Sequence, residues 1–159
     1  MGLNDWLLAL HLLSGFALFA AMTLFWVAIV AIRRTDLPEQ VVSAGRLLPV
    51  GSVVAVVGSL GVIVFGVWLA IALDGIRVWD GWVIAAIVLW AIASETGRRS
   101  DPEFAPCLDR AAELVAAGQT GPDAQLAELA RTSRGLLLHS IATVAVVLLL
   151  VDMIWKPGA

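Results

Sequence analysis

The sequence predicts an all-α membrane protein built as an up-down bundle of four transmembrane helices. Hydrophobic residues make up 60% of the 159 residues and charged residues only 14%, and the mean hydropathy is +0.94. Soluble domains carry about 25% charged residues, so the composition excludes a water-soluble fold as the main interpretation. The apolar residues gather into four long runs without the alternation of barrel strands. In lipid, such runs satisfy their backbone amides as helices.

The four runs cover about residues 6–32, 47–73, 78–95 and 135–155. A bilayer core of about 30 Å takes about 20 helical residues, so each run reaches or approaches the length of one crossing. The first run is too long for a signal-peptide core, and no basic residue precedes it, which indicates a retained crossing. The connections between the first three runs are short, which favours antiparallel neighbours in one bundle.

Basic residues predict how the chain is oriented. The two termini and the connection near residue 75 carry only Arg77 and Lys156, and the other eight basic residues lie in the remaining two connections: Arg33, Arg34, Arg46, Arg98, Arg99, Arg110, Arg131 and Arg134. Arginine-rich loops stay in the cytoplasm, so both termini are expected outside. We expect Trp26 and Trp90 to anchor the inner interface and the other five tryptophans the outer one. The net charge of −3 favours neither nucleic acid nor an anionic lipid surface.

The segment 97–134 is the one sizeable stretch outside the membrane. Asp101-Pro102-Glu103 is a helix-start pattern, and Gly118 ends the helix that follows. A second helix begins near Gly121-Pro122-Asp123. The simplest interpretation is a short cytoplasmic helical hairpin that lies against the bundle or the membrane surface. The alternative is a docking surface for a partner.

The second run carries a stripe of small residues, Gly51, Ala55 and Ser59, spaced four apart on one helix face. Small residues at this spacing let helix backbones approach closely. Internal packing is the default interpretation. A homodimer contact and room for a flat cofactor are the alternatives.

Four ionisable residues within the predicted crossings are candidate functional groups, because such residues are costly in lipid: His11, Glu95, His139 and Asp152. The two histidines lie near the starts of oppositely directed helices, about 20 Å apart along the membrane normal. Two ligands of one metal need backbones within about 13 Å, which argues against one haem held by both. Matching heights instead predicts two pairs, His11 with Asp152 and His139 with Glu95. The alternatives are a pair between Asp152 and Lys156, and a solvated Glu95.

Each histidine has a glycine one turn away on the same helix face, Gly15 beside His11 and Gly135 beside His139. These glycines leave room for a porphyrin-like plane, or they permit close helix contact. Each histidine could therefore bind a separate haem or pigment, with His11 and Gly15 in one leaflet and His139 and Gly135 in the other. The remaining candidates are His11 and Asp152 for a transition metal, and Glu95 as a partner of His139.

Three segments carry a family resemblance: Leu10-His11, Gly66-Val67-Trp68-Leu69 leading to Trp79-Asp80-Gly81-Trp82, and the ending Trp155-Lys156-Pro157-Gly158. Together they resemble an uncharacterised family of predicted bacterial integral membrane proteins with four helices. The resemblance covers nearly the whole chain and implies a location in the bacterial inner membrane. That family is distantly similar to the copper-resistance CopD proteins and to the HemJ-type protoporphyrinogen oxidase, which also place a histidine in the first helix. Only His11 matches that feature, and the Lys/Arg partners of the HemJ-type helices are absent, so oxidase activity is not implied.

These observations lead to a non-enzymatic membrane protein whose His11 region binds haem or a metal ion. The sequence carries no phosphate loop, nucleophile–base motif or paired catalytic carboxylates. The alternative is an interaction or assembly subunit without a cofactor, as a homo-oligomer or in a membrane complex. A third interpretation is a proton- or ion-conducting element, but the expected middle of the bilayer holds only small hydroxyl groups, and conduction needs polar groups or water there.

Overall fold

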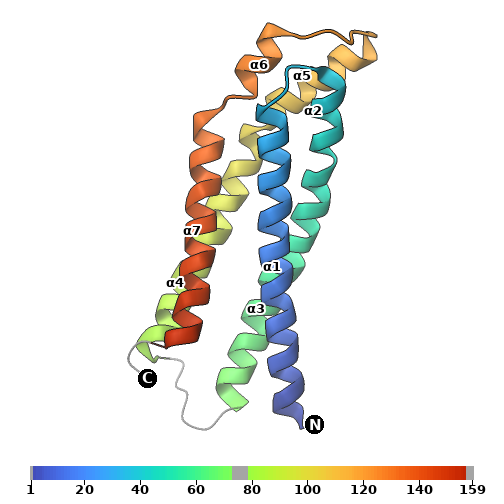
Figure 1. Cartoon of the computed structure of the whole chain (residues 1–159). Helices are drawn as coiled ribbons and strands as arrows, with labels where there is room; N and C mark the ends of the chain where they lie inside the picture. Colours follow the sequence, from blue (N-terminus) through green and yellow to red (C-terminus); the bar gives the residue numbers. More distant parts are fainter. Residues whose placement is uncertain (1, 73–78, 157–159) are drawn as a thin grey trace.

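The computed structural model describes residues 2–72 and 79–156. Every regular element in these ranges is helical, and four long helices run side by side (Figure 1). They are α1 (Leu3–Arg33), α3 (Leu47–Ala72), α4 (Gly81–Ser100) and α7 (Ser133–Trp155). Shorter helices gather at one end: α2 (Pro38–Gly45), the 3₁₀ turn η1 (Asp101–Glu103), α5 (Ala105–Ala116) and α6 (Ala124–Leu129). The all-helical prediction is confirmed for these ranges.

Three segments are long and apolar enough to cross a membrane: Leu3–Arg33, Pro38–Ala72 and Ala124–Trp155. These correspond to the first, second and fourth predicted crossings. The third predicted crossing corresponds to α4, which does not meet the same measure of length and composition. Its 20 residues include Glu95, Arg98 and Arg99. The connection near residue 75 lies outside the described residues.

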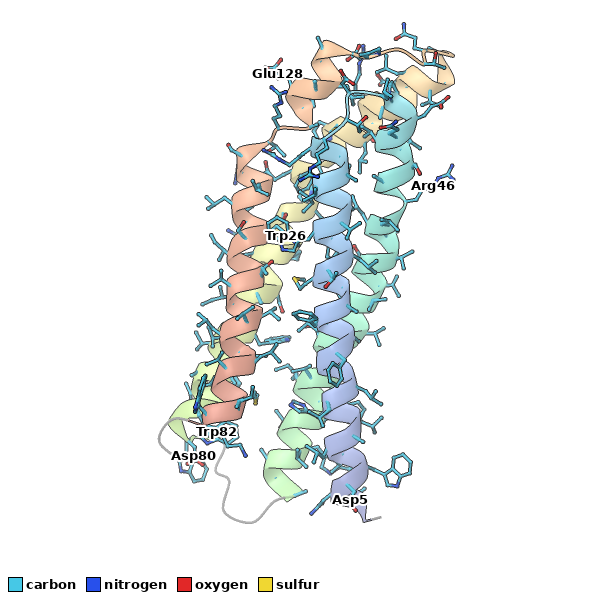
Figure 2. The ribbon with its side chains drawn as sticks, viewed as in Figure 1. Asp5, Trp26, Arg46, Asp80, Trp82 and Glu128 are labelled. Atoms are coloured by element: carbon cyan, nitrogen blue, oxygen red, sulfur yellow. The ribbon has the colours of Figure 1, made fainter. Side chains whose placement is uncertain are left out.

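The long helices form two closely packed pairs, α1 with α3 and α4 with α7. Contacts between the two pairs are much sparser than contacts within them. Figure 2 shows that the labelled charged residues lie at the two ends, with Asp5 and Asp80 at one end and Arg46 and Glu128 at the other. The stretch between these ends carries apolar side chains, as a lipid-facing surface requires.

Among the glycines of α3, Gly58 is the one that lies directly against the backbone of α1. A methyl carbon placed on Gly58 would lie 2.8 Å from the Leu18 backbone nitrogen and 3.0 Å from the Ser14 carbonyl oxygen. Gly51 lies on the same helix and faces the Phe25 ring at 3.4 Å. The predicted stripe of small residues is therefore used for internal packing at Gly51. The contact with the α1 backbone is at Gly58, which lies outside the predicted Gly51, Ala55, Ser59 set.

The helix α4 extends to Ser100, beyond the predicted end at residue 95. Glu95 accepts hydrogen bonds from Arg98 Nη2 at 2.9 Å and from Arg99 Nε at 2.6 Å. Ion pairs three and four residues apart stabilise a helix, which explains why the polar sequence after residue 93 does not end it. The Asp101-Pro102-Glu103 pattern forms the 3₁₀ turn, and α5 begins only at Ala105. The pattern thus starts a 3₁₀ turn, and the α-helix begins three residues after the predicted first position, Pro102.

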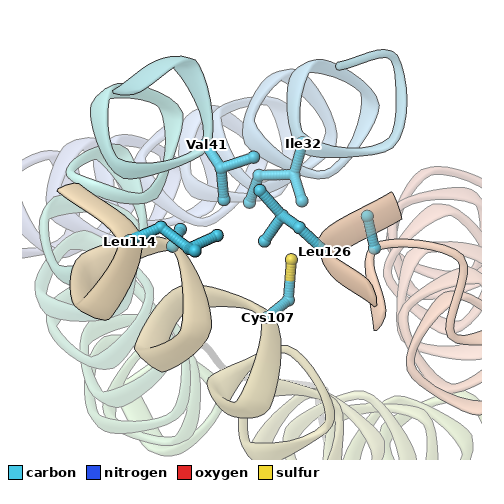
Figure 3. Packing of buried hydrophobic residues seen from close by; sticks show 7 residues of the cluster. Ile32, Val41, Cys107, Leu114 and Leu126 are labelled. Carbon is cyan, nitrogen blue, oxygen red and sulfur yellow. The ribbon is translucent and has the colours of Figure 1, made fainter. Parts of the chain in front are cut away.

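The short helices build a cap at the arginine-rich end of the bundle. Its buried core joins side chains from α1, α2, α5 and α6: Ile32, Val41, Cys107, Ala111, Leu114, Leu126 and Ala130 (Figure 3). The helix α2 is absent from the sequence prediction, which treats residues 33–46 as a simple connection. Gly118 has a φ of +73° and its amide donates to the Val115 carbonyl at 3.0 Å, so it ends α5 near the predicted position.

Two contacts attach this cap to α1 and the chain that follows it. Arg33 Nη1 donates to the Thr132 carbonyl at 3.0 Å, and the Asp123 amide donates to the Asp36 carbonyl at 3.2 Å. Asp123 is also the N-cap of α6, where its Oδ1 accepts from the Leu126 amide at 2.7 Å. That hydrogen bond is the main reason why the pKa of Asp123 lies below its ordinary value of 3.8, and Arg110 lowers it further.

We predict that Gly58→Ala destabilises the α1/α3 pair by about 1–3 kcal/mol, because backbone atoms of α1 cannot move aside as a flexible side chain would. The free energy of unfolding, measured in mixed detergent micelles, checks this. Gly97→Ala on α4 is the matched control, because a methyl carbon there meets nothing within 4 Å. Equal stability of the two variants would contradict the close approach.

We predict that Asp123→Ala speeds amide hydrogen exchange in α6 at neutral pH, whereas Asp123→Asn keeps a capping oxygen and exchanges nearly as slowly as wild type. Because the pKa of Asp123 is lowered in the folded chain, its stabilising contribution is present above 3.8 and is lost as the pH falls through the lowered pKa. Exchange read by mass spectrometry tests the prediction. Identical exchange in wild type and Asp123→Ala near pH 7 would overturn it.

Candidate functional site

His11 lies in the third turn of α1 and points at α3. Its Nδ1 is 3.1 Å from the Val62 carbonyl oxygen. A carbonyl oxygen only accepts, so Nδ1 carries the hydrogen and Nε2 holds the free lone pair. The ring lies against Gly66, where an added methyl carbon would approach the His11 Cε1 to 2.9 Å. Gly66 therefore provides the space in which the imidazole sits.

Gly15, one turn after His11, has open space beside it. A methyl carbon placed on Gly15 of α1 meets no atom within 4 Å. By contrast, Gly51, Gly58 and Gly66 of α3 each face α1 directly. The sequence left two roles open for this glycine. The geometry favours free volume over close helix contact on this side of α1.

His139 lies at the opposite end of the bundle, in the second turn of α7, and is only 3% exposed. Two aromatic rings of α1 meet its imidazole in edge-to-face geometry, Phe25 at a centroid distance of 5.7 Å and Trp26 at 5.0 Å. Its Nε2 has no hydrogen-bond partner among the described residues. A buried polar atom without a partner costs free energy, so this nitrogen is a candidate for contact with a bound molecule.

A cavity of about 240 Å³ lies next to His139, where the bundle meets the cap. The walls come from all four long helices, α2, η1, α5 and Phe104 just before α5. They are mostly apolar: Phe25, Ile29, Gly45, Leu48, Pro49, Ser52, Ser100, Asp101, Phe104, Ala105, Leu108 and His139. Desolvation by neighbouring atoms raises the pKa of the Asp101 carboxyl above its ordinary value. Among these residues, only His139 was predicted from the sequence to be a site residue.

Gly135 does not leave free space beside His139. A methyl carbon there would lie 2.9 Å from the Phe104 ring and 3.0 Å from the Glu103 Cβ. Its carbonyl accepts a hydrogen bond from Ser100 Oγ at 3.0 Å. Of the two roles predicted for this glycine, the structure favours close contact, here with the turn that leads into α5.

The predicted pairs between histidines and carboxylates are not formed in the described residues. The Glu95 side chain is exposed and forms ion pairs with Arg98 and Arg99. This agrees with the alternative of a solvated Glu95 and not with a pair between Glu95 and His139. His11 donates to a backbone carbonyl instead of to Asp152. The pair of His11 with Asp152 assumed that α1 and α7 are close neighbours along their length, but the contacts of α1 are mainly with α3. The helices of Glu95 and His139, α4 and α7, do pack together, but Glu95 pairs with the arginines of its own helix.

Asp152 is 8% exposed, and its Oδ2 has no hydrogen-bond partner in the described part of the chain. The alternative pair with Lys156 is also not formed there, because the Lys156 ammonium lies over the Trp82 ring, 5.4 Å from its centroid. No group of three or more His, Cys, Asp or Glu side chains within residues 2–72 and 79–156 is placed to hold a metal ion. Any metal bound at His11 would thus need ligands from outside this set.

Three of the seven tryptophans make contacts inside the bundle, whereas most were expected to be interface anchors. Trp26 Nε1 donates to Thr143 Oγ1 at 2.9 Å, and Trp90 Nε1 donates to Ser59 Oγ at 2.8 Å. Trp26 therefore joins α1 to α7 (Figure 2), and Trp90 joins α4 to α3. Trp82 is buried. The exposed Trp6, Trp68, Trp79 and Trp155 fit the predicted belt. Sequence gave no signal for the two hydrogen bonds, because Ser59 and Thr143 are far from the tryptophans along the chain.

The chain was compared with family models, with curated proteins and with solved structures, and none of the three comparisons found a match.

We predict that Trp26→Phe lowers the free energy of unfolding by about 0.6–1 kcal/mol, because it removes one hydrogen bond between the helix pairs and keeps an aromatic ring beside His139. Unfolding in mixed detergent micelles measures this. Trp155→Phe at an exposed position serves as control. A Trp26→Phe variant as stable as this control would show that the hydrogen bond contributes nothing.

Proposed function

We propose that this chain is a bacterial inner-membrane protein that crosses the bilayer four times and binds haem, or failing that a transition-metal ion, through His11 Nε2. The observation that carries the proposal is the 3.1 Å contact between His11 Nδ1 and the Val62 carbonyl. Histidines that bind a metal usually donate their other ring hydrogen to a carbonyl or carboxylate, which fixes the tautomer and raises the basicity of the ligating nitrogen.

The surroundings of His11 support haem over a bare metal ion. Gly66 holds the imidazole on α3, and the open space at Gly15 lies on the same face of α1 as His11. A single histidine is a sufficient protein ligand for haem iron, as in globins. A bare transition-metal ion normally takes three or four protein ligands, and no such group is present within the described ranges.

The fourth crossing and the orientation belong to the same proposal. The helix α4 packs along α7, which is apolar enough to cross a membrane. A helix that pairs along such a crossing shares its depth. The cap at the far end carries most of the arginines, including Arg33 and Arg110, and the rule that basic loops stay inside would put it in the cytoplasm.

The competing function is an assembly subunit without a cofactor. The sparse contact between the α1/α3 and α4/α7 pairs favours it, because helices of a partner could bind between or beside two such weakly joined pairs. The two functions differ in one measurable property, which is whether purified protein carries a chromophore or metal.

We predict that protein purified in mild detergent shows a Soret band that shifts on reduction and disappears in His11→Ala. His139→Phe is the matched control, because it removes the other histidine and keeps an aromatic ring, and it should keep the band. Absorption spectra of the oxidised and reduced protein test this, together with the metal content by mass spectrometry.

Two results would decide against haem. A flat visible spectrum at good yield, with a stoichiometric metal that His11→Ala removes, would leave metal binding as the function of His11. A flat spectrum without metal would overturn the proposal and favour the assembly subunit. Gly15→Leu adds a check of the geometry: it should weaken haem binding with little effect on folding, because it fills the open space.

A further inference from the structure

We propose that the cavity beside His139 binds one substituted aromatic or quinoid ring that carries a hydrogen-bonding oxygen. This site is separate from the His11 site, because His139 lies near the start of α7 at the cap and His11 near the start of α1 at the other end (Figure 1). The inference therefore does not depend on haem binding.

The size of the cavity sets the size of the ligand. An apolar cavity of about 150 Å³ holds benzene, so about 240 Å³ accommodates one six-membered ring with small substituents. Drug-sized ligands occupy about 300–1,000 Å³, and a porphyrin is larger than a single ring by a wide margin. The volume thus suits a single ring and is small for a porphyrin.

The chemistry of the walls selects an apolar ring over water. Phe25, Ile29, Leu48, Phe104 and Leu108 supply apolar side chains on several sides. A buried water needs two to four polar partners, and most of this surface offers none. Edge-to-face contacts with Phe25 and Phe104 suit an aromatic or quinoid ring, since such contacts add to the burial of area.

His139 defines the polar group that the ring must carry. It is 3% exposed, it lines the cavity, and its Nε2 lacks a hydrogen-bond partner among the described residues. A neutral imidazole donates from one nitrogen and accepts at the other, so a hydroxyl or carbonyl oxygen matches it. Neighbouring atoms cover Nε2, so the proposal includes a small turn of the ring that brings Nε2 to the ligand. A ring with one such oxygen would form a hydrogen bond with the imidazole and at the same time fill the apolar volume.

We predict that 4-fluorophenol binds the full-length protein in detergent with a saturable change in its ¹⁹F resonance, measured against empty micelles. Ala105→Leu should abolish saturable binding, because the larger side chain occupies the cavity. Ala112→Leu on the exposed side of the same helix is the matched control and should bind as wild type does. His139→Phe should bind about five- to tenfold more weakly through loss of one hydrogen bond.

The outcome that overturns the proposal is a ¹⁹F change that never saturates, or one that is equal in Ala105→Leu and Ala112→Leu, since either would reflect partition into micelles. Circular dichroism and size-exclusion elution confirm that each variant is folded. Unchanged binding in His139→Phe would also contradict the proposal, because the histidine is its polar determinant. Competition with decylubiquinone identifies the source of the ring: displacement indicates the head group of a membrane quinone, and bound probe that is not displaced indicates a free phenolic molecule.

Discussion

The close approach of α1 and α3 at Gly58 is the contact on which the rest of the bundle depends. At Gly58, backbone atoms of α1 lie within about 3 Å of the place where a side chain would begin, so the two helices touch there without intervening side chains. Lipid tails are as apolar as leucine, so association in a membrane rests on such packing and on hydrogen bonds. The same proximity brings His11 within reach of the Val62 carbonyl and leaves only a glycine-sized space for its ring at Gly66. The position of the His11 imidazole therefore depends on the same close packing that holds α1 against α3.

Different forces hold the cap and the bundle together. The cap core, which includes Ile32, Val41 and Leu126, lies at the charged end, and there the removal of apolar surface from water stabilises it. Within lipid, the two helix pairs gain no stabilisation from the removal of apolar surface from water. They are joined by the ring contacts of Phe25 and Trp26 with His139 and by the hydrogen bonds of Trp26 and Trp90. The cavity beside His139 lies between the bundle and the cap. Side chains of the bundle and of the cap must fill that space from different directions, and neither set fills it completely.

Long-range composition made the helical class and three of the crossings predictable from the sequence, because a run of about 20 apolar residues has few alternatives in lipid. The ends of elements were less predictable. Glu95 reads as a helix-ending polar residue, yet its pairs with Arg98 and Arg99 extend α4 to Ser100. The site was harder still. Matching heights along the membrane placed His11 with Asp152, but height says nothing of which helix is the neighbour. Pairing of α1 with α3 was decided by glycines whose facing partners, Ser14 and Leu18, carry no distinctive signal.

The two histidines illustrate how one residue type acquires opposite properties from its surroundings. His11 is anchored through Nδ1 and is bordered by open space at Gly15, so its environment fixes one nitrogen and leaves the neighbouring glycine uncovered. His139 is enclosed by Phe25 and Trp26, and the turn at Phe104 fills the glycine beside it, so its environment leaves one polar atom without a partner in a small volume. An anchored ring suits a permanent ligand, since the cost of orienting it is already met by the fold. An unpartnered buried nitrogen suits an exchangeable molecule, because the empty state keeps an unsatisfied group that binding relieves. If both proposals hold, the bundle combines a fixed site at one end with a reversible site at the other.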